Sequence, residues 1–151
     1  MQLPYVLTSP HARPPERATE GAAGLDLCAA LAAPLRLPAG GRAIVPTGLC
    51  LAIPQGCVGL LFARSGLAAR QGVTLANGVG VIDSDYRGEV GVALVNLGAQ
   101  DYDIAPGDRI AQLVLMACAP AEPVRVGALG DTVRGCGGFG STGKGGQEGG
   151  D

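Results

Sequence analysis

Three polar side chains stand in apolar surroundings where their chemistry would be useful. Asp83 follows an apolar stretch and precedes a turn, a position that can hold a carboxylate at the rim of a pocket. Gln112 interrupts the apolar segment 109–117, where an amide is an unusual residue for a covered strand. Asp26 lies between two leucines, so its carboxylate is expected to point inward toward a defined partner. Carboxylates and an amide held in this way are groups that can bind a polar ligand.

A second chemical group opens the one segment that reads as helical, residues 65–71. Arg64, Ser65 and Gly66 stand at its start. Backbone N–H groups at a helix N-terminus, together with a guanidinium and a hydroxyl, suit an oxyanion or a phosphate. The formal net charge is −2, so no global positive field favours a nucleic-acid polymer. Any phosphate binding is therefore local.

The C-terminal segment, residues 134–151, is rich in glycine and poor in apolar residues. Such a composition does not fold alone, so a flexible tail is expected. It either closes over a phosphorylated ligand or is simply a disordered terminus. Its glycine spacing matches a dinucleotide-binding pattern and part of a Walker A loop. Both motifs need a strand before them and a helix after them, and the sequence predicts neither here. In the Walker A match, Gly145 also stands where the Mg²⁺-binding Ser/Thr would be. Both of those interpretations are rejected.

The elements that must position these groups are short strands. Glycine and proline interrupt the chain about every 8–12 residues, and residues 90–94 alternate large and small side chains, which predicts an all-β sandwich or barrel. The segment 109–117 is apolar at nearly every position. Both of its faces should therefore be covered, one of them by a subunit interface. The low charged fraction, 16%, also suggests surface buried against other copies of the chain.

The sequence lacks the residues that several classes of function require. The five cysteines form no C-x-x-C pair, and His11 is the one histidine, which argues against a disulfide framework, a zinc cluster and Ser-His-Asp catalysis. No apolar run approaches the ~18 residues of a membrane span, and residues 1–17 contain no secretory signal. An intracellular, cytoplasmic protein is expected, with a nuclear location or a viral source left open.

Five segments resemble, in type and order, the five motifs of trimeric dUTP pyrophosphatases, the dUTPases. They are AGLDL (23–27), RSGLA (64–68), GVIDSDYRG (80–88), GDRIAQLV (107–114) and RGCGGFGSTG (134–143). The resemblance runs from about residue 20 to Lys144. It implies a jelly-roll-like (β-clip) subunit, a homotrimer, and Mg²⁺-dependent hydrolysis of dUTP to dUMP and pyrophosphate. In a cell, such an enzyme keeps uracil out of DNA and supplies dUMP for dTMP synthesis.

The resemblance gives roles to the third motif. Asp83 would be the general base that activates a water for attack on the α-phosphorus. Tyr86 would lie against the sugar and leave no room for a 2′-hydroxyl. Residues 77–81, with Asn77 as the looser assignment and Gly80, would form a hairpin whose main-chain groups read the uracil edge. The structural alternatives are a turn aspartate that bonds its own backbone and a tyrosine that only packs.

Phosphate binding is implied for the second and fourth motifs. Arg64, Ser65 and Gly66 would form the cradle, and Gln112 would donate its amide to an α-phosphate oxygen. Many relatives have a proline where this chain has Ala63, which should loosen the loop without removing the chemistry. Asp108 and Arg109 are interpreted mainly as a structural turn and an ion pair.

By the same resemblance, Asp26 would hold a water of the Mg²⁺ shell, the ion being bound mainly by the substrate phosphates. The alternative is a structural carboxylate that bonds backbone amides or an arginine, and the two roles can coexist. In the tail, Phe139 would stack on uracil, while Gly140 and its neighbouring glycines present their amides. Three further tail residues would hold the β- and γ-phosphates: Arg134, Ser141 and Thr142.

The predicted organisation is one domain, residues 1–129, followed by a tail, residues 130–151, that closes over a neighbouring subunit's site. The expected partners are dUTP and further copies of the chain, with no nucleic-acid polymer and no membrane. Two alternatives differ in chemistry. A dCTP deaminase on the same scaffold would depend on a glutamate base, and a nucleotide sensor would keep the pocket for regulation. Residues 1–20 and 145–151 carry no assigned function.

Overall fold

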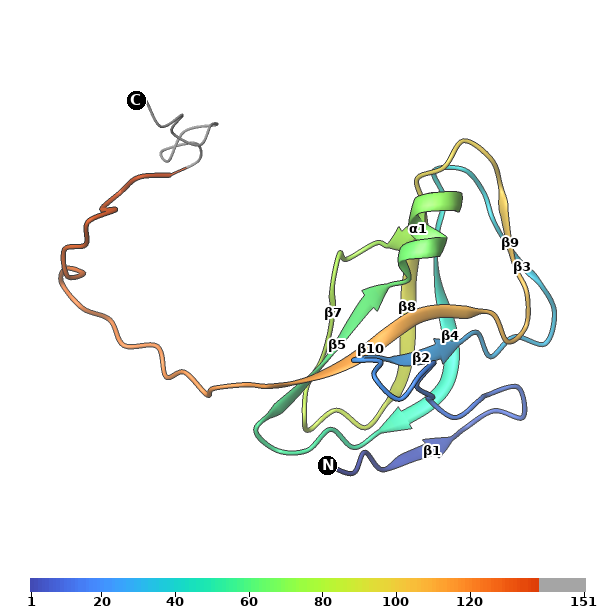
Figure 1. Ribbon diagram of the computed structural model, residues 1–151, viewed down its shortest axis with the longest axis horizontal. Helices are drawn as coiled ribbons and strands as arrows, with labels where there is room; N and C mark the ends of the chain where they lie inside the picture. Colours follow the sequence, from blue (N-terminus) through green and yellow to red (C-terminus); the bar gives the residue numbers. More distant parts are fainter. Residues whose placement is uncertain (139–151) are drawn as a thin grey trace, which may run out of the picture. The chain divides into compact units, whose positions relative to one another are not determined.

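The computed structural model of the chain describes residues 1–138, which form ten β-strands and one α-helix (Figure 1). The strands are β1 (Tyr5–Leu7), β2 (Leu25–Cys28), β3 (Leu35–Leu37), β4 (Arg42–Leu51), β5 (Cys57–Ala63), β6 (Val73–Leu75), β7 (Gly80–Ile82), β8 (Glu89–Asn96), β9 (Tyr102–Ile104) and β10 (Arg109–Ala117). The helix is α1 (Ser65–Gln71), at the residues predicted for it. The predicted all-β class with one short helix is confirmed.

All of these elements belong to the unit Met1–Pro120, and a second unit begins at Ala121. The described residues of the second unit, 121–138, contain no strand or helix. Within this unit Arg134 makes a local contact, because its Nε donates a 3.0 Å hydrogen bond to the carbonyl of Gly137. No helix in the described part of the chain is long and apolar enough to cross a membrane.

The strands of the first unit form two four-stranded sheets and one two-stranded sheet, with every pairing antiparallel. The strand orders are β1-β4-β8-β6, β2-β10-β5-β7 and β3-β9. Neighbours in a sheet are therefore mostly strands that are distant in the sequence, as in jelly-roll folds. The glycine turns between strands were predicted, and Gly40, Gly56 and Gly107 adopt the positive φ that such turns favour.

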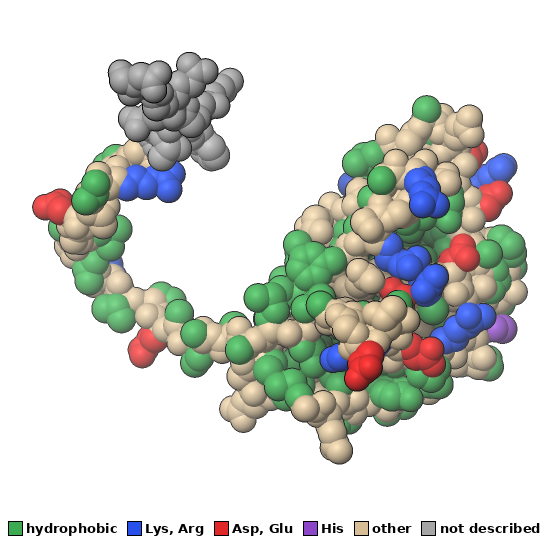
Figure 2. All heavy atoms as spheres, viewed as in Figure 1, with side chains coloured by type: hydrophobic (Ala, Val, Ile, Leu, Met, Phe, Trp, Pro, Cys, Tyr) green, Lys and Arg blue, Asp and Glu red, His purple; other side chains and the backbone are tan. Residues whose placement is uncertain are grey.

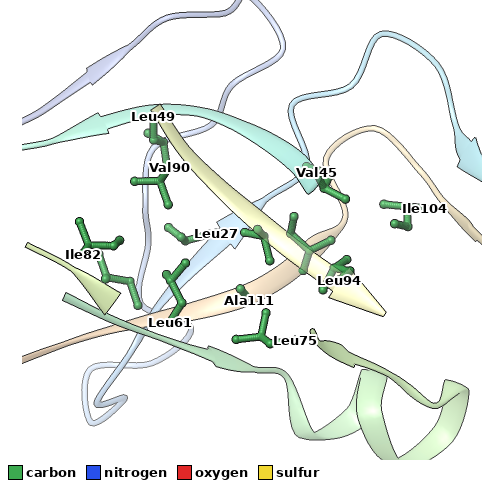
Figure 3. Close-up of a cluster of buried hydrophobic side chains, with 14 of the residues drawn as sticks. Leu27, Val45, Leu49, Leu61, Leu75, Ile82, Val90, Leu94, Ile104 and Ala111 are labelled. Carbon is green, nitrogen blue, oxygen red and sulfur yellow. The ribbon is translucent and has the colours of Figure 1, made fainter. Parts of the chain in front are cut away.

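The hydrophobic core lies between the two four-stranded sheets (Figure 3). Val90, Val92 and Leu94 are buried on one face of β8, as the predicted alternation requires. They pack in one cluster with Leu27 and Leu61 of the other sheet. This two-sheet packing fixes the edges and outer faces on which polar side chains are displayed.

Strand β10 has one covered face and one open face in the single chain. Ala111 and Leu113 point into the core and are buried. Val114 is only partly buried and Met116 is 49% exposed, so the described elements of the first unit leave part of the outward face open. The prediction that both faces are covered is thus met on the inner face only.

Asn96 at the end of β8 ties three backbone segments together from a fully buried position. Its amide nitrogen donates to the carbonyls of Leu37 (3.0 Å) and Gln100 (2.8 Å), and its oxygen accepts from the N–H of Gly98 (2.9 Å). Asn96→Ala should lower the free energy of unfolding by about 2–4 kcal/mol, because buried partners are left unpaired and a cavity remains. Urea unfolding at matched protein concentration measures this.

The exposed Gln55→Ala variant is the control for Asn96→Ala and should change the free energy of unfolding by less than about 0.5 kcal/mol. Equal stability of the Asn96 variant and the wild type would show that water replaces these hydrogen bonds without cost.

Candidate active site

An arginine-lined cleft of about 510 Å³ forms where β5 ends, α1 begins and β10 passes beside them. We call it the arginine cleft; its lining residues are Arg64, Ser65, Gly66, Leu67, Arg70, Gln71, Tyr102, Asp108, Arg109, Ile110 and Gln112. It contains four of the predicted phosphate-binding residues, namely Arg64, Ser65, Gly66 and Gln112. Figure 2 shows basic side chains gathered on the face between α1 and β2.

Strand register explains why these residues meet. In the sheet, Gln112 of β10 lies opposite Asp26 of β2 on one side and Phe62 of β5 on the other. Arg64 follows Phe62 by two residues and therefore continues the same face of the sheet. Side chains that are far apart in the sequence are thus placed in one row on the outer face of this sheet.

The buried carboxylate of Asp26 binds three of the donors in this row. Its Oδ1 accepts a 3.2 Å hydrogen bond from Gln112 Nε2, and its Oδ2 accepts one of 3.1 Å from Arg109 Nη1. Arg64 Nε lies 3.3 Å from Oδ1 as an ion pair, although its alignment is not that of a hydrogen bond. Arg109, interpreted as part of an ion pair, therefore pairs with Asp26.

A second cleft of about 220 Å³ contains residues predicted for the base, the sugar and the attacking water. We call it the aspartate cleft; Asn77, Gly80, Asp83 and Tyr86 line it, together with residues of β8. Asp83 directly follows β7 and is exposed, and its carboxylate has no hydrogen-bond partner among the described residues. It is therefore available to accept a proton.

Tyr86 is held in place at the rim of the aspartate cleft. Its hydroxyl donates a 2.9 Å hydrogen bond to the carbonyl of Glu89, and its backbone N–H donates to the carbonyl of Asp83 (3.2 Å). A Cβ at position 88 would overlap the Tyr86 hydroxyl, so any larger residue there would displace the tyrosine ring. The ring position is thus determined by the turn that also carries Asp83.

The predicted hairpin at residues 77–81 is wrong in its pairing. Strand β6 pairs with β8 in one sheet and β7 pairs with β5 in the other, so the segment between them crosses from sheet to sheet. Gly78 turns the chain there with φ 70°. Gly80 approaches β5 so closely that a Cβ would lie 3.0 Å from the Cβ of Leu61. The segment still presents main-chain groups to the aspartate cleft.

The two clefts share no lining residue. Within one chain the structure therefore brings Asp83, Tyr86, Asn77 and Gly80 together, and separately the predicted phosphate-binding residues of the second and fourth motifs. Arg134 belongs to the second unit. The remaining tail predictions lie outside the described residues: Phe139, Gly140, Ser141 and Thr142.

Three polar residues are among those of the arginine cleft that were not assigned to it from the sequence. Arg70 lies on α1 one helical turn after Gly66, a spacing that could have placed it on the same face. Tyr102 has no local signal, since β9 reaches the cleft only through the fold. Burial, and secondarily the Asp108 carboxylate, raises the pKa of the Tyr102 hydroxyl, so it stays neutral. Arg109 is the third of these residues.

The chemistry of Asp26 limits how a metal ion could be held. Its two oxygens offer about four acceptor positions; Arg109 and Gln112 take two of them by hydrogen bonds, and the Arg64 guanidinium lies beside Oδ1 as an ion pair. No group of three or more acidic, histidine or cysteine side chains in the described part of the chain could hold a metal ion. The site therefore fits an ion contacted through water and does not fit one bound directly by a protein cage.

An antiparallel fold that carries an arginine-rich cleft and a second cleft with an available carboxylate is typical of a protein that acts on small phosphorylated molecules. Residues 11–143 match the sequence pattern of the dUTPase family. The chain belongs to the dUTPase family. The resemblance inferred from the five motifs is confirmed, and with it the prediction that the chain is an enzyme, a dUTP diphosphatase.

Individual relatives agree with this family. The chain is 53% identical over 133 residues to the deoxyuridine 5'-triphosphate nucleotidohydrolase of Beijerinckia indica, covering 87% of this chain and 83% of that one. The Staphylococcus bacteriophage 80alpha dUTPase with dUPNHPP has a TM-score of 0.88 at 29% identity, covering 95% and 99%. A dUTPase from phage phi11 of S. aureus, described with a structural Mg(II) ion, has a TM-score of 0.77 at 28% identity, covering 85% and 98%.

Proposed function

We propose that the chain hydrolyses dUTP to dUMP and pyrophosphate with Asp83 as the general base. The observation that supports this most directly is the exposed Asp83 carboxylate in one cleft with Tyr86 and the main chain of residues 77–81. Asp83 takes a proton from water while the water oxygen bonds to the α-phosphorus. The bond from that phosphorus to the bridging oxygen breaks, and pyrophosphate leaves. A positioned base contributes about 10²–10⁴-fold to such a rate.

Base and sugar selection follow from the walls of the aspartate cleft. Main-chain groups of the segment 77–81 pair with the uracil edge, and a fixed backbone leaves the donors of cytosine unpaired. Gly80 permits a close approach of the ligand to the backbone. The Tyr86 ring fills the place that a 2′-hydroxyl would need. Phosphates then extend to Arg64, Ser65, Gly66 and Gln112, whose donors neutralise the negative charge.

Gly88→Ala tests the role of Tyr86, because the three atoms nearest to the added methyl group all belong to the Tyr86 ring and hydroxyl, which it would displace. We expect the preference for dUTP over UTP, as a ratio of kcat/KM, to fall about 10–100-fold. Pyrophosphate release from both nucleotides measures it. Tyr86→Phe, which keeps the ring, is the matched control. An unchanged ratio in the alanine variant would mean that another wall excludes ribose.

Mg²⁺ is proposed as the cofactor, and the phage phi11 relative, described with a structural Mg(II) ion, supports it. In this chain Asp26 would contact the ion through a water, since the two hydrogen bonds from Arg109 and Gln112 leave acceptor positions on its carboxylate. When bound, the ion supplies positive charge that neutralises the triphosphate. The chain's own contribution is the orientation of the phosphates by Arg64, Ser65 and Gln112.

A homotrimer with sites at subunit junctions is proposed on two observations. The two clefts of one chain share no residue, although one substrate must contact both. Part of the outer face of the sheet β2-β10-β5-β7, away from the polar row at Gln112, is apolar and open, with Val81 64% and Met116 49% exposed. Figure 2 shows hydrophobic side chains gathered where β5 and β7 lie. A second copy of the chain would cover this face and join the clefts.

The tail, residues 130–151, is proposed to complete the site of a neighbouring subunit. Phe139 stacks on uracil, and Gly140 with its neighbours presents backbone amides. The residues that hold the β- and γ-phosphates are Arg134, Ser141 and Thr142. Closure excludes water other than the attacking one. Such an enzyme, acting in the cytoplasm, keeps uracil out of DNA and supplies dUMP.

Pyrophosphate release from dUTP, dCTP, dTTP and UTP in the presence of Mg²⁺ tests the proposed function. Release from dUTP alone is the expected result, because base, sugar and phosphates are each selected. Equal release from several nucleotides would overturn the roles of the segment 77–81 and Tyr86. Ammonia formed from dCTP would assign the chain to deamination instead.

A further inference from the structure

Asp26 holds three donors of the arginine cleft but does not itself line that cleft. Gln112 and Arg109 bind its two oxygens at 3.2 and 3.1 Å, and Arg64 pairs with it at 3.3 Å. The Asp26 side chain is 6% exposed, whereas that of Arg109 is 51% exposed. One buried carboxylate therefore fixes donors whose remaining N–H groups are open to a ligand.

The charges explain why such a carboxylate is needed. Arg64, Arg70 and Arg109 line the arginine cleft, and Asp108 is the acidic side chain among its lining residues. The Asp108 carboxylate already accepts the backbone N–H of Ala105 at 2.8 Å. Guanidinium groups in one cleft repel each other and would spread apart without a partner. Asp26 bridges Arg64 and Arg109 and so keeps two like charges close together.

The backbone around Asp26 is held without its carboxylate. The Asp26 N–H donates a 2.7 Å hydrogen bond to the carbonyl of Glu16, and the residue is paired with Gln112 in the ladder between β2 and β10. The carboxylate is thus not required to place the strand. Its contacts serve the orientation of side chains, which is the property that a preorganised phosphate site requires.

We propose that Asp26 is a positioning residue that sets the arginine cleft before any metal ion arrives, and that Arg109, which it holds, binds the triphosphate together with Arg64. This inference rests on the proposed function, because it concerns the same substrate. It differs from a role through Mg²⁺-bound water in one measurable respect. Asp26 then matters for the binding of a nucleotide even where no metal ion is present.

The experiment is equilibrium dialysis of dUTP against the full chain in EDTA, where no metal-assisted binding occurs. Asp26→Asn keeps the size of the side chain and removes the charge that holds the arginines. We expect its Kd for dUTP to rise roughly 10–100-fold over the wild type, as loss of charge-assisted hydrogen bonds predicts. Arg109→Gln should have a similar effect, and the double variant should be no weaker than the weaker single variant.

Arg36→Gln is the matched control, since Arg36 is an exposed arginine paired with Asp103 and lies outside both clefts. Its Kd should equal that of the wild type. Unchanged dUTP affinity in EDTA for Asp26→Asn, with a higher Mg²⁺ requirement, would overturn the proposal in favour of a role through the metal. Additive effects of the Asp26 and Arg109 substitutions would also overturn it, because they would mean that the two act independently.

Two further readouts keep the proposal testable. If circular dichroism shows that Asp26→Asn does not fold, the binding of dUTP in EDTA to Arg109→Gln and Arg109→Lys decides the question. The proposal requires that Arg109→Gln bind dUTP more weakly than the wild type and that Arg109→Lys recover part of the affinity. Equal dUTP affinity of the two variants would overturn it. Inorganic pyrophosphate in EDTA is the second probe. Failure of the wild type to bind dUTP would overturn the proposed function. If the wild type binds pyrophosphate and Asp26→Asn binds it more weakly, that result would still support the positioning role.

Discussion

Replacing Asp83 by asparagine is expected to lower kcat for dUTP by about 10²–10⁴-fold, the usual contribution of a general base. Asparagine has the shape of aspartate but does not accept the proton of the attacking water. In the structure the Asp83 carboxylate is exposed and has no hydrogen-bond partner among the described residues, so no structural contact is lost with it. The Kd for dUTP should therefore change little.

Asp85→Asn is the matched control for this prediction. Asp85 is an exposed aspartate of the same turn, but it does not line the aspartate cleft. Its kcat should stay within about twofold of the wild type, as is usual for surface substitutions away from the reaction. Single-turnover release of pyrophosphate separates the chemical step from binding. Comparable losses in both variants would mean that the turn as a whole, and not the Asp83 carboxylate, is needed.

The chemistry of the site could be read from the sequence where a short segment carries its own geometry. The helix at residues 65–71 was predictable because the segment lacks β-branched residues and ends at Gly72, whose φ of 71° closes the last turn. Asp83 could be placed after a strand because β7 is apolar and a turn follows. In such cases the local pattern and the tertiary structure agree.

Contacts made by long-range register could not be predicted in the same way. The pairing of Asp26 with Gln112 depends on how β2 and β10 align, and the two residues are 86 positions apart. The pairing of β7 with β5 instead of β6 follows from the order of strands in two separate sheets. Nothing in the segment 77–81 itself distinguishes a hairpin from a crossing between sheets, because both need a glycine turn.

The separation of the two clefts leads to the second large effect, recovery of activity by mixing two inactive variants. Asp83→Asn removes the base from the aspartate cleft, and Arg64→Gln removes a phosphate-binding guanidinium from the arginine cleft. Co-expressed in equal amounts, the two chains should form mixed trimers. If each site takes one cleft from each of two chains, about a quarter of the junctions combine two intact clefts. Activity should return to about a quarter of the wild-type value.

A second mixture makes this result quantitative. Wild-type chains co-expressed with the double variant Asp83→Asn/Arg64→Gln should also give about a quarter of wild-type activity if sites lie between chains. If both clefts of one chain served one site, this mixture would give about half, and the mixture of single variants would give none. Since an apolar part of the outer face of β10, at Met116, is open and the clefts share no residue, we expect the first pattern. Half activity in the second mixture would instead require both clefts to reach one substrate within a single chain.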